Sequence, residues 1–188
     1  MKSLALFAAL AGSAVFAAPA FAQQKLVPAQ SEIVFISKQM GVPVEGRFKK
    51  FDAQVAFDPK KPETSKIAFT IDLGSASLGA AETEDELKKP GWFNSKAVPA
   101  ATFTSSAIKA SGPGKFDVTG KLNIKGSSQD VTVPVTLAQA GATTTANGSF
   151  AIKRLDYKIG EGEWSDTSMV ANDVQVRFKL TLTGVPAL

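Results

Sequence analysis

The acidic side chains are the first candidates for chemistry in this chain. Two groups of them stand out, which are Glu82, Glu84, Asp85 and Glu86 in one and Glu161, Glu163 and Asp166 in the other. A pair of carboxylates can hydrolyse a glycosidic bond, with one acting as acid and the other as base or nucleophile. The chain has no histidine and no cysteine, so the commonest general base, a thiolate nucleophile and the usual zinc ligands are excluded.

Both acidic groups have a simpler structural interpretation. Residues 80–89 are rich in helix formers, and the acids precede Lys88 and Lys89, an order that suits the helix dipole. Pro90 and Gly91 would end that helix. Acids in a loop commonly keep the surface soluble or accept hydrogen bonds from nearby backbone. We therefore predict no catalytic residue and no metal site, and we keep a carboxylate-based secreted hydrolase as an alternative.

Most of the remaining chain alternates between apolar and polar residues, which is the pattern of strands that bury one face. The clearest alternation lies within residues 67–73, 116–124, 131–137 and 174–182. Residues 44–57 form another long strand, and a slip in its alternation at Lys49-Lys50 indicates a bend or bulge. Helices between the strands are missing, which excludes a parallel α/β fold. The pattern predicts an all-β fold, an antiparallel β-barrel of about eight strands with a short helix insertion, and a β-sandwich is the alternative.

The first 22 residues have the pattern of a secretory signal peptide. Lys2 provides the positive start, residues 4–18 are apolar, and Ala20-Phe21-Ala22 is a cleavage site. We therefore expect cleavage after residue 22, leaving residues 23–188 as a single domain in the periplasm or outside the cell. No later segment predicts an integral membrane span. The net charge of +4 is carried by scattered lysines, which predicts no nucleic-acid partner.

The inward-facing columns of these strands carry most of the phenylalanines, and phenyl rings favour a dry site. One interpretation is a packed core, and the other is a lumen that holds one small ligand, for which a barrel of about eight strands has room. Gly46, Gly120 and Gly148 on or near these columns remove volume that a packed core would fill. The residues predicted to form the lumen wall are Ile33, Phe35, Phe48, Val55, Phe57, Phe69, Ile71, Phe103, Phe116, Val118, Leu122, Phe150 and Phe178.

Such walls restrict the ligand to a molecule with a long apolar tail. Its polar head would stay at the mouth of the barrel, near the helix and the irregular segment that follows residue 153. We predict Trp92 and Trp164 at this rim, because indole has an apolar body and one donor at its tip. A plug that seals the end of the barrel is the alternative role for each tryptophan.

Several stretches together resemble the YceI-like family of bacterial polyisoprenoid-binding periplasmic proteins. They are residues 31–35 (SEIVF), 44–48 (VEGRF), 51–53 (FDA), 92–94 (WFN), 99–105 (PAATFTS), 120–126 (GKLNIKG), 131–135 (VTVPV) and 159–164 (IGEGEW). The resemblance implies an extended lipocalin-like barrel that holds an isoprenoid chain, as a prenyl quinone or polyprenyl lipid, for transport, storage or sequestration. It implies no cofactor apart from this lipid, for which a ubiquinone-like molecule is one candidate.

One segment departs from the family pattern. Many members have an Arg-Asp-x-His-Leu-like segment before the aromatic pair, whereas this chain has Thr83-Glu84-Asp85-Glu86-Leu87. The contacts of the head group therefore cannot be transferred from the resemblance. The resemblance also leaves open whether the protein forms a homodimer and whether it makes transient contact with a membrane or with membrane proteins.

Two further alternatives concern the barrel itself. A structural β-domain with a solid core would have the same alternating pattern. An outer-membrane barrel fits poorly, because such barrels carry aromatic girdles and this chain has one tyrosine and two tryptophans.

Overall fold

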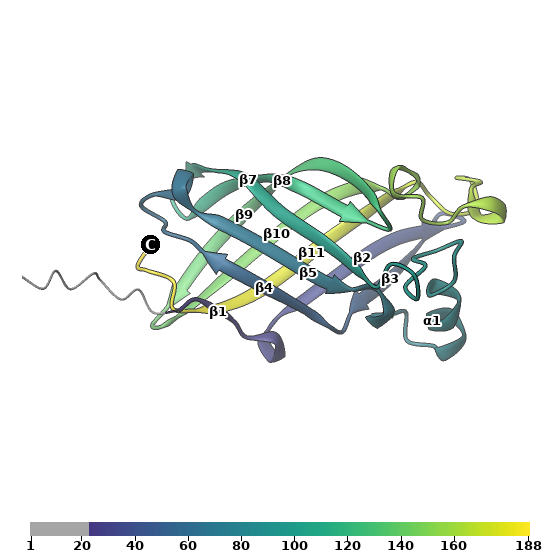
Figure 1. Ribbon diagram of the computed structural model, residues 1–188, viewed down its shortest axis with the longest axis horizontal. Helices are drawn as coiled ribbons and strands as arrows, with labels where there is room; N and C mark the ends of the chain where they lie inside the picture. The colour runs from purple at the N-terminus through teal and green to yellow at the C-terminus, as the bar shows by residue number, and fades with distance from the viewer. Residues whose placement is uncertain (1–22) are drawn as a thin grey trace, which may run out of the picture.

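The alternating segments pair with one another as an antiparallel sheet that curls around a long axis (Figure 1). The computed structural model describes residues 23–188, and the predicted signal peptide lies outside the described residues. Along the sheet the strands follow the order β4-β5-β7-β8-β9-β10-β11-β2-β3-β6, and β1 pairs with β11. The strands are β1 (Lys25–Leu26), β2 (Glu32–Gln39), β3 (Val42–Phe48), β4 (Phe51–Ala56), β5 (Lys66–Asp72), β6 (Ala76–Ser77), β7 (Ala100–Gly112), β8 (Lys115–Ile124), β9 (Ser127–Ala140), β10 (Thr143–Lys153) and β11 (Asp173–Thr183).

The slip in alternation at Lys49-Lys50 marks a bend that curls the sheet. The strand predicted over residues 44–57 is divided there into β3 and β4. Strand β3 pairs with β2 and β6, whereas β4 pairs with β5. Strands β6 and β4 are the two ends of the strand order, so the chain crosses here from one edge of the sheet to the other. The backbone of Lys49 and Lys50 bonds to Ser75 and Asp72, which joins the two edges. The structure has eleven strands where eight were predicted. Two of the additional strands are the two-residue strands β1 and β6, and the third arises from the division of the predicted strand into β3 and β4.

One α-helix and five 3-10 helices interrupt the described strands, and α1 lies with the 154–172 segment at the right-hand end of the barrel (Figure 1). Helix α1 spans Ala81–Leu87, slightly shorter than predicted, and buries Leu87. Residues 23–188 contain no helix that is long and apolar enough to cross a membrane. The 3-10 helices are η1 (Pro28–Gln30), η2 (Pro62–Thr64), η3 (Leu73–Ser75), η4 (Arg154–Tyr157) and η5 (Gly162–Trp164).

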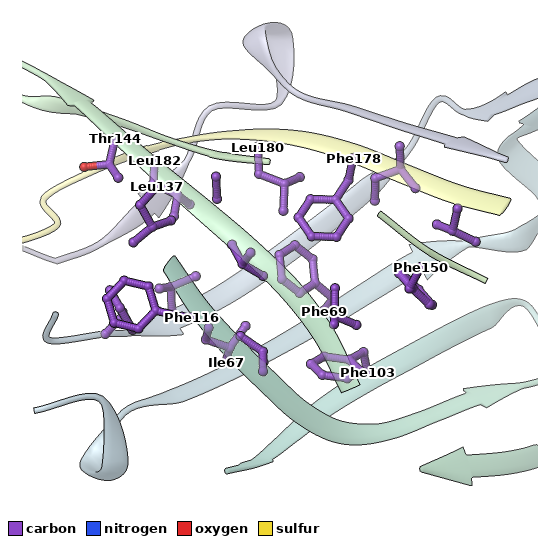
Figure 2. A pocket seen from close by; sticks show the side chains of 18 of the residues that line it. Ile67, Phe69, Phe103, Phe116, Leu137, Thr144, Phe150, Phe178, Leu180 and Leu182 are labelled. Carbon is purple, nitrogen blue, oxygen red and sulfur yellow. The ribbon is translucent and has the colours of Figure 1, made fainter. Parts of the chain in front are cut away.

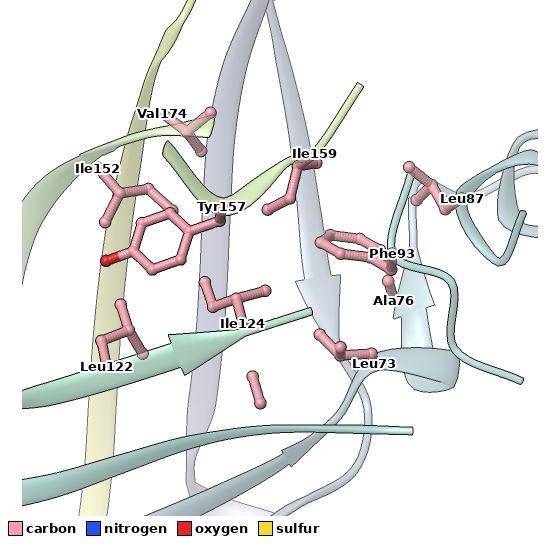
Figure 3. Close-up of a cluster of buried hydrophobic side chains, with 11 residues drawn as sticks. Leu73, Ala76, Leu87, Phe93, Leu122, Ile124, Ile152, Tyr157, Ile159 and Val174 are labelled. Carbon is pink, nitrogen blue, oxygen red and sulfur yellow. The ribbon is translucent and has the colours of Figure 1, made fainter. Parts of the chain in front are cut away.

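Helix η4 covers a place where two neighbouring strands separate. Strands β9 and β10 pair only from Ala140↔Thr143 to Val135↔Gly148. The next residue of β9 is Pro134, which has no N–H to donate to the ladder. Beyond this point Tyr157 of η4 lies between Ile152 of β10 and Ile124 of β8 (Figure 3). The ring of Tyr157 therefore completes the wall of the barrel where the sheet does not.

The buried ring of Tyr157 makes stability depend on alkaline pH. The residue is 2% exposed, and burial, followed by the charge of Asp156, raises the pKa of its phenol to about 12 from 10.0. Because the folded state favours the neutral phenol, its contribution is complete below pH 10.0 and is lost as the pH rises through about 12. We expect the free energy of unfolding to fall by roughly 2 kcal/mol over that window.

Denaturant unfolding at several alkaline pH values, on the unmodified protein and on Tyr157→Phe, checks this expectation. The variant lacks the phenol but keeps the lysines that titrate in the same pH range, so the difference between the two proteins reports Tyr157 alone. The chain has a single tyrosine, so the absorbance of tyrosinate reports this one group. Formation of tyrosinate in the folded protein at the ordinary pKa would contradict the burial of the phenol.

Candidate functional site

The inward side chains leave an apolar cavity (Figure 2). Val185, close to the C-terminus, is among its lining residues, so the cavity lies at the end of the barrel where the chain ends (Figure 1). This cavity, chamber 1, has a volume of about 130 Å3, and the surface that faces it is entirely apolar. Thr144 supplies the one polar side-chain atom among its lining residues, and its Oγ1 accepts a hydrogen bond from Gln139 Nε2 at 3.2 Å. An apolar cavity of about 150 Å3 stays dry and binds a benzene-sized guest. The space therefore argues against a packed core.

A second cavity, chamber 2, continues chamber 1 towards α1 and the 154–172 segment. It has a volume of about 110 Å3, and its lining includes Leu87 of α1, Phe93 after α1, and Arg154 of η4. Five residues line both chambers, so the two are adjacent along the barrel. The shared residues are Ile33, Ile71, Leu122, Phe150 and Val176.

The structure places the predicted lumen wall around these chambers. Phe35 and Phe48 line chamber 2. The other predicted residues line chamber 1, and they are Ile33, Val55, Phe57, Phe69, Ile71, Phe103, Phe116, Val118, Leu122, Phe150 and Phe178. Alternation within each strand is sufficient to place them, because successive side chains point to opposite faces. Their role in binding a ligand stays a prediction.

The prediction of the wall omitted nearly half of the lining of chamber 1. Most of the omitted residues share a column with a predicted one, so the alternation could have found them. Val185 follows the end of β11 and has no such signal. The omitted residues are Ile67, Val133, Val135, Leu137, Thr144, Ala146, Val176, Leu180, Leu182 and Val185.

Three inward glycines leave space at the wall that phenylalanine rings occupy. A Cβ at Gly46 would overlap the ring of Phe35, and a Cβ at Gly148 would overlap the ring of Phe178; each ring belongs to the cross-strand partner of its glycine. Gly120 receives Phe103 from the neighbouring strand in the same way. The glycines therefore keep these rings out of the lumen, which is the volume effect that the sequence predicted.

Replacing Gly148 by alanine tests this arrangement. The added Cβ would push the ring of Phe178 into chamber 1, because the atom it meets is at the far end of that side chain. Losing roughly 50 Å2 of contact would weaken binding of an apolar fluorescent probe by about tenfold, at about 25 cal/mol per Å2. The exposed neighbour Ser149 provides the control, and Ser149→Ala should bind the probe as the unmodified protein does. Equal probe binding by the two variants would contradict the arrangement.

Trp92 and Trp164 lie together at the end of the barrel near α1. Their ring centroids are 5.5 Å apart. Both side chains are half-buried, and Trp92 lines chamber 2 whereas Trp164 of η5 lines neither chamber. Of the pair, only Trp92 is therefore positioned to contact what the chamber holds.

The segment that covers chamber 2 is held by a buried arginine that sequence reasoning missed. Arg154 is 1% exposed. Burial lowers the pKa of its guanidinium, but an arginine remains charged in a protein. All five of its N–H groups donate to backbone carbonyls. Nε donates to Ala171 (3.1 Å), Nη1 to Ile159 (2.9 Å) and Gly160 (2.8 Å), and Nη2 to Trp164 (2.6 Å) and Val170 (2.8 Å).

One carboxylate from each acidic group is engaged in local hydrogen bonds that lower its pKa. Glu84 accepts hydrogen bonds from Ser77 and from Lys49, which together lower its pKa. Asp166 accepts from the hydroxyl (2.7 Å) and the backbone N–H (2.8 Å) of Ser168, and these bonds lower its pKa. A general acid needs a raised pKa instead. Among residues 23–188 no three acidic side chains gather into a possible metal site.

Comparison with known proteins identifies a family for this chain. A profile of the YceI-like domain matches residues 24–182. A UPF0312 protein of Pseudomonas aeruginosa (strain LESB58) is 35% identical over 169 residues, which cover 84% of this chain and 87% of that protein. The crystal structure of BcnA from Burkholderia cenocepacia has a TM-score of 0.81 and 50% identity, and the match covers 83% of this chain and 98% of that chain.

A more distant solved structure shares the fold. It is a polyisoprenoid-binding domain from Saccharophagus degradans that is implicated in plant cell wall breakdown. Its TM-score is 0.71 at 17% identity, and the match covers 87% of this chain and 99% of that chain. These matches confirm the predicted antiparallel barrel with its short helix.

Proposed function

The chain belongs to the YceI-like family, and from this premise we propose that it binds an isoprenoid lipid, a prenyl quinone or polyprenyl lipid, in its barrel lumen. The observation that carries the proposal is the pair of adjacent apolar chambers, of about 130 Å3 and about 110 Å3. A hydrocarbon tail needs a long, dry space without polar groups along it, and chamber 1 offers no polar surface. The solved polyisoprenoid-binding domain with the same fold supports this choice of ligand.

The energetics favour tight binding from the tail alone. A tail that buries about 500 Å2 of apolar surface gains on the order of 12 kcal/mol, against which ordering costs several kcal/mol. No covalent or catalytic step is needed for such a function. The engagement of Glu84 and Asp166 in local hydrogen bonds supports a binding protein over a hydrolase.

The same proposal includes transport, storage or sequestration of the lipid in the periplasm or outside the cell. A lipid carrier must exchange its ligand with a membrane by transient contact. Met40 and Val42 at the β2–β3 hairpin and Met169 in the 154–172 segment are exposed apolar side chains. The backbone N–H of Met40 donates to the carbonyl of Met169, so the hairpin and the 154–172 segment are neighbours at this point. Ser37, on the same strand as the start of the hairpin, lines chamber 2. We expect the contact with the membrane at these exposed side chains.

Lipid extraction tests the proposed function. Residues 23–188, purified and extracted with organic solvent, should yield a co-purified isoprenoid lipid by mass spectrometry, and the delipidated protein should take up an added prenyl quinone. A protein that contains no lipid and takes up no prenyl quinone would overturn the proposal.

A further inference from the structure

The end of chamber 1 is closed in part by a short segment outside the sheet. Strand β11 ends at Thr183, and Gly184 adopts a left-handed backbone conformation (φ +77°) that turns the chain away from the strand. Residues 184–188, which we call the strap, lie at this end of the barrel (Figure 1). Val185 of the strap is 7% exposed and lines chamber 1. The strap therefore supplies part of the inner surface of the lumen without belonging to a strand.

The hydrogen bonds of the strap come from one side chain, that of Gln139 on β9. Its Nε2 donates to the carbonyls of Val185 (3.2 Å) and Pro186 (3.4 Å). Its Oε1 accepts from the backbone N–H of Leu188 (3.2 Å). Within residues 23–188, no hydrogen bond joins the backbone of the strap to the backbone of another segment. The same Nε2 donates to Thr144 in the wall of chamber 1, so Gln139 connects the strap to that wall.

The neighbouring parts of this end are held more firmly. The amide of Gln24 makes two hydrogen bonds to the backbone of Phe57, at 2.7 Å to the carbonyl and at 2.9 Å from the N–H. The ring of Phe57 packs edge-to-face against Phe116 of β8, with centroids 5.0 Å apart. Both rings belong to the buried cluster that includes Val185. Because the strap has no backbone pairing, it is the part of this closure that moves at the lowest cost.

The length of a bound tail decides whether the strap must move. A tail that fits within the two chambers is buried while Val185 stays in place. A longer tail has to displace Val185, and exposing this apolar side chain to water is unfavourable. Bonds to water can replace those of Gln139, so their net loss is small. The strap therefore imposes a penalty that begins at the tail length that fills both chambers.

We propose that the strap selects the length of the isoprenoid tail that the protein binds. Val185 closes the lumen, and Gln139 is the positioning residue that holds Val185 there. Tails that fit the chambers bind with the strap closed, whereas longer tails displace the strap and leave the barrel at this end. This inference rests on the proposed function and adds to it a selection by tail length.

Prenyl benzoquinones with tails of two to ten isoprene units test the inference. Gln139→Ala and Val185→Ala should each raise the affinity for the longest tail about tenfold over that of the unmodified protein, because displacing the strap then costs less. The same variants should change the affinity for short tails by less than about threefold. Comparing the proteins at each tail length cancels the differences in solubility between the probes. Gln129→Ala, at an exposed glutamine of the same strand, should bind every tail as the unmodified protein does.

A cysteine in the strap reports its movement directly, because the chain contains no cysteine. Val185→Cys places a small apolar side chain at this buried position. Its thiol should react slowly with an alkylating reagent in the free protein and in the complex with a short tail. The reaction should be about tenfold faster with the longest tail bound. Leu188→Cys, at a strap residue that is 46% exposed, should react rapidly in all three states.

The remaining outcomes each count against the inference. If Gln139→Ala changes the affinity alike at every tail length, Gln139 only stabilises the fold and the selection by length is overturned. A Val185→Cys thiol that stays protected with the longest tail bound would overturn the displacement of the strap. Both results would leave lipid binding intact, whereas failure of every tail to bind the unmodified protein would overturn the proposed function as well.

Discussion

Ala146→Phe is expected to lower the affinity for an isoprenoid lipid by at least about 100-fold while the protein remains folded. Ala146 is 6% exposed and lines chamber 1 between its cross-strand partners Leu137 and Leu180. A phenyl ring added there would enter a cavity of about 130 Å3, which is close to the size that one benzene-like guest occupies. The ring would replace the tail of the lipid, and equilibrium dialysis with a labelled prenyl quinone measures the loss.

The adjacent outward position gives a matched control. Asn147 is exposed on the same strand, so Asn147→Phe adds the same ring outside the barrel and should leave lipid affinity unchanged. Thermal unfolding of Ala146→Phe should show a cooperative transition, because the ring fills existing space instead of displacing packed atoms. A folded Ala146→Phe protein that binds the lipid with unchanged affinity would place the ligand outside chamber 1.

Arg154→Met is expected to destabilise the protein by roughly 3–5 kcal/mol. The substitution keeps an apolar stem of similar length but removes all five hydrogen bonds to the carbonyls of the segment that covers chamber 2. Those carbonyls would be left buried without donors or would open to water, and the covering segment would separate from the barrel. Urea unfolding monitored by far-UV circular dichroism measures the change in the free energy of unfolding.

Two further variants separate this effect from a simple loss of positive charge. Arg154→Lys keeps the charge but has three donors in place of five, so it should recover only part of the stability. Arg177 pairs with Glu45 on the surface at 3.0 Å, and both side chains are about half exposed, so Arg177→Met should change stability by less than about 1 kcal/mol. Equal losses of unfolding free energy in Arg154→Met and Arg177→Met would show that the hydrogen bonds from Arg154 to the carbonyls stabilise the protein no more than a surface ion pair does.

The side to which each residue points was predictable from local pattern. Alternation along a strand is a property of the extended backbone itself, so Phe116 and Val118 face the lumen whichever strands flank them. The bend at Lys49-Lys50 was predictable for the same reason, since a slip of one residue turns the remaining side chains to the other face. The sequence pattern was therefore sufficient for the all-β class, the curled sheet and most of the predicted lumen wall.

The free space inside the barrel, and the chemistry at its end, depended on tertiary structure. Whether the ring of Phe178 fills the lumen or lies against its wall depends on the register that sets Gly148 opposite it. The separation of β9 from β10 places Tyr157 in the wall, and no local pattern specifies that separation. Arg154 has no motif around it, and a charged residue in an irregular segment is normally exposed. Its burial arises because the fold of the 154–172 segment brings five carbonyls, from residues 5 to 17 positions further along the chain, within reach of its guanidinium. Strand alternation is decided by neighbours in sequence, whereas cavities and buried charges are decided by neighbours in space.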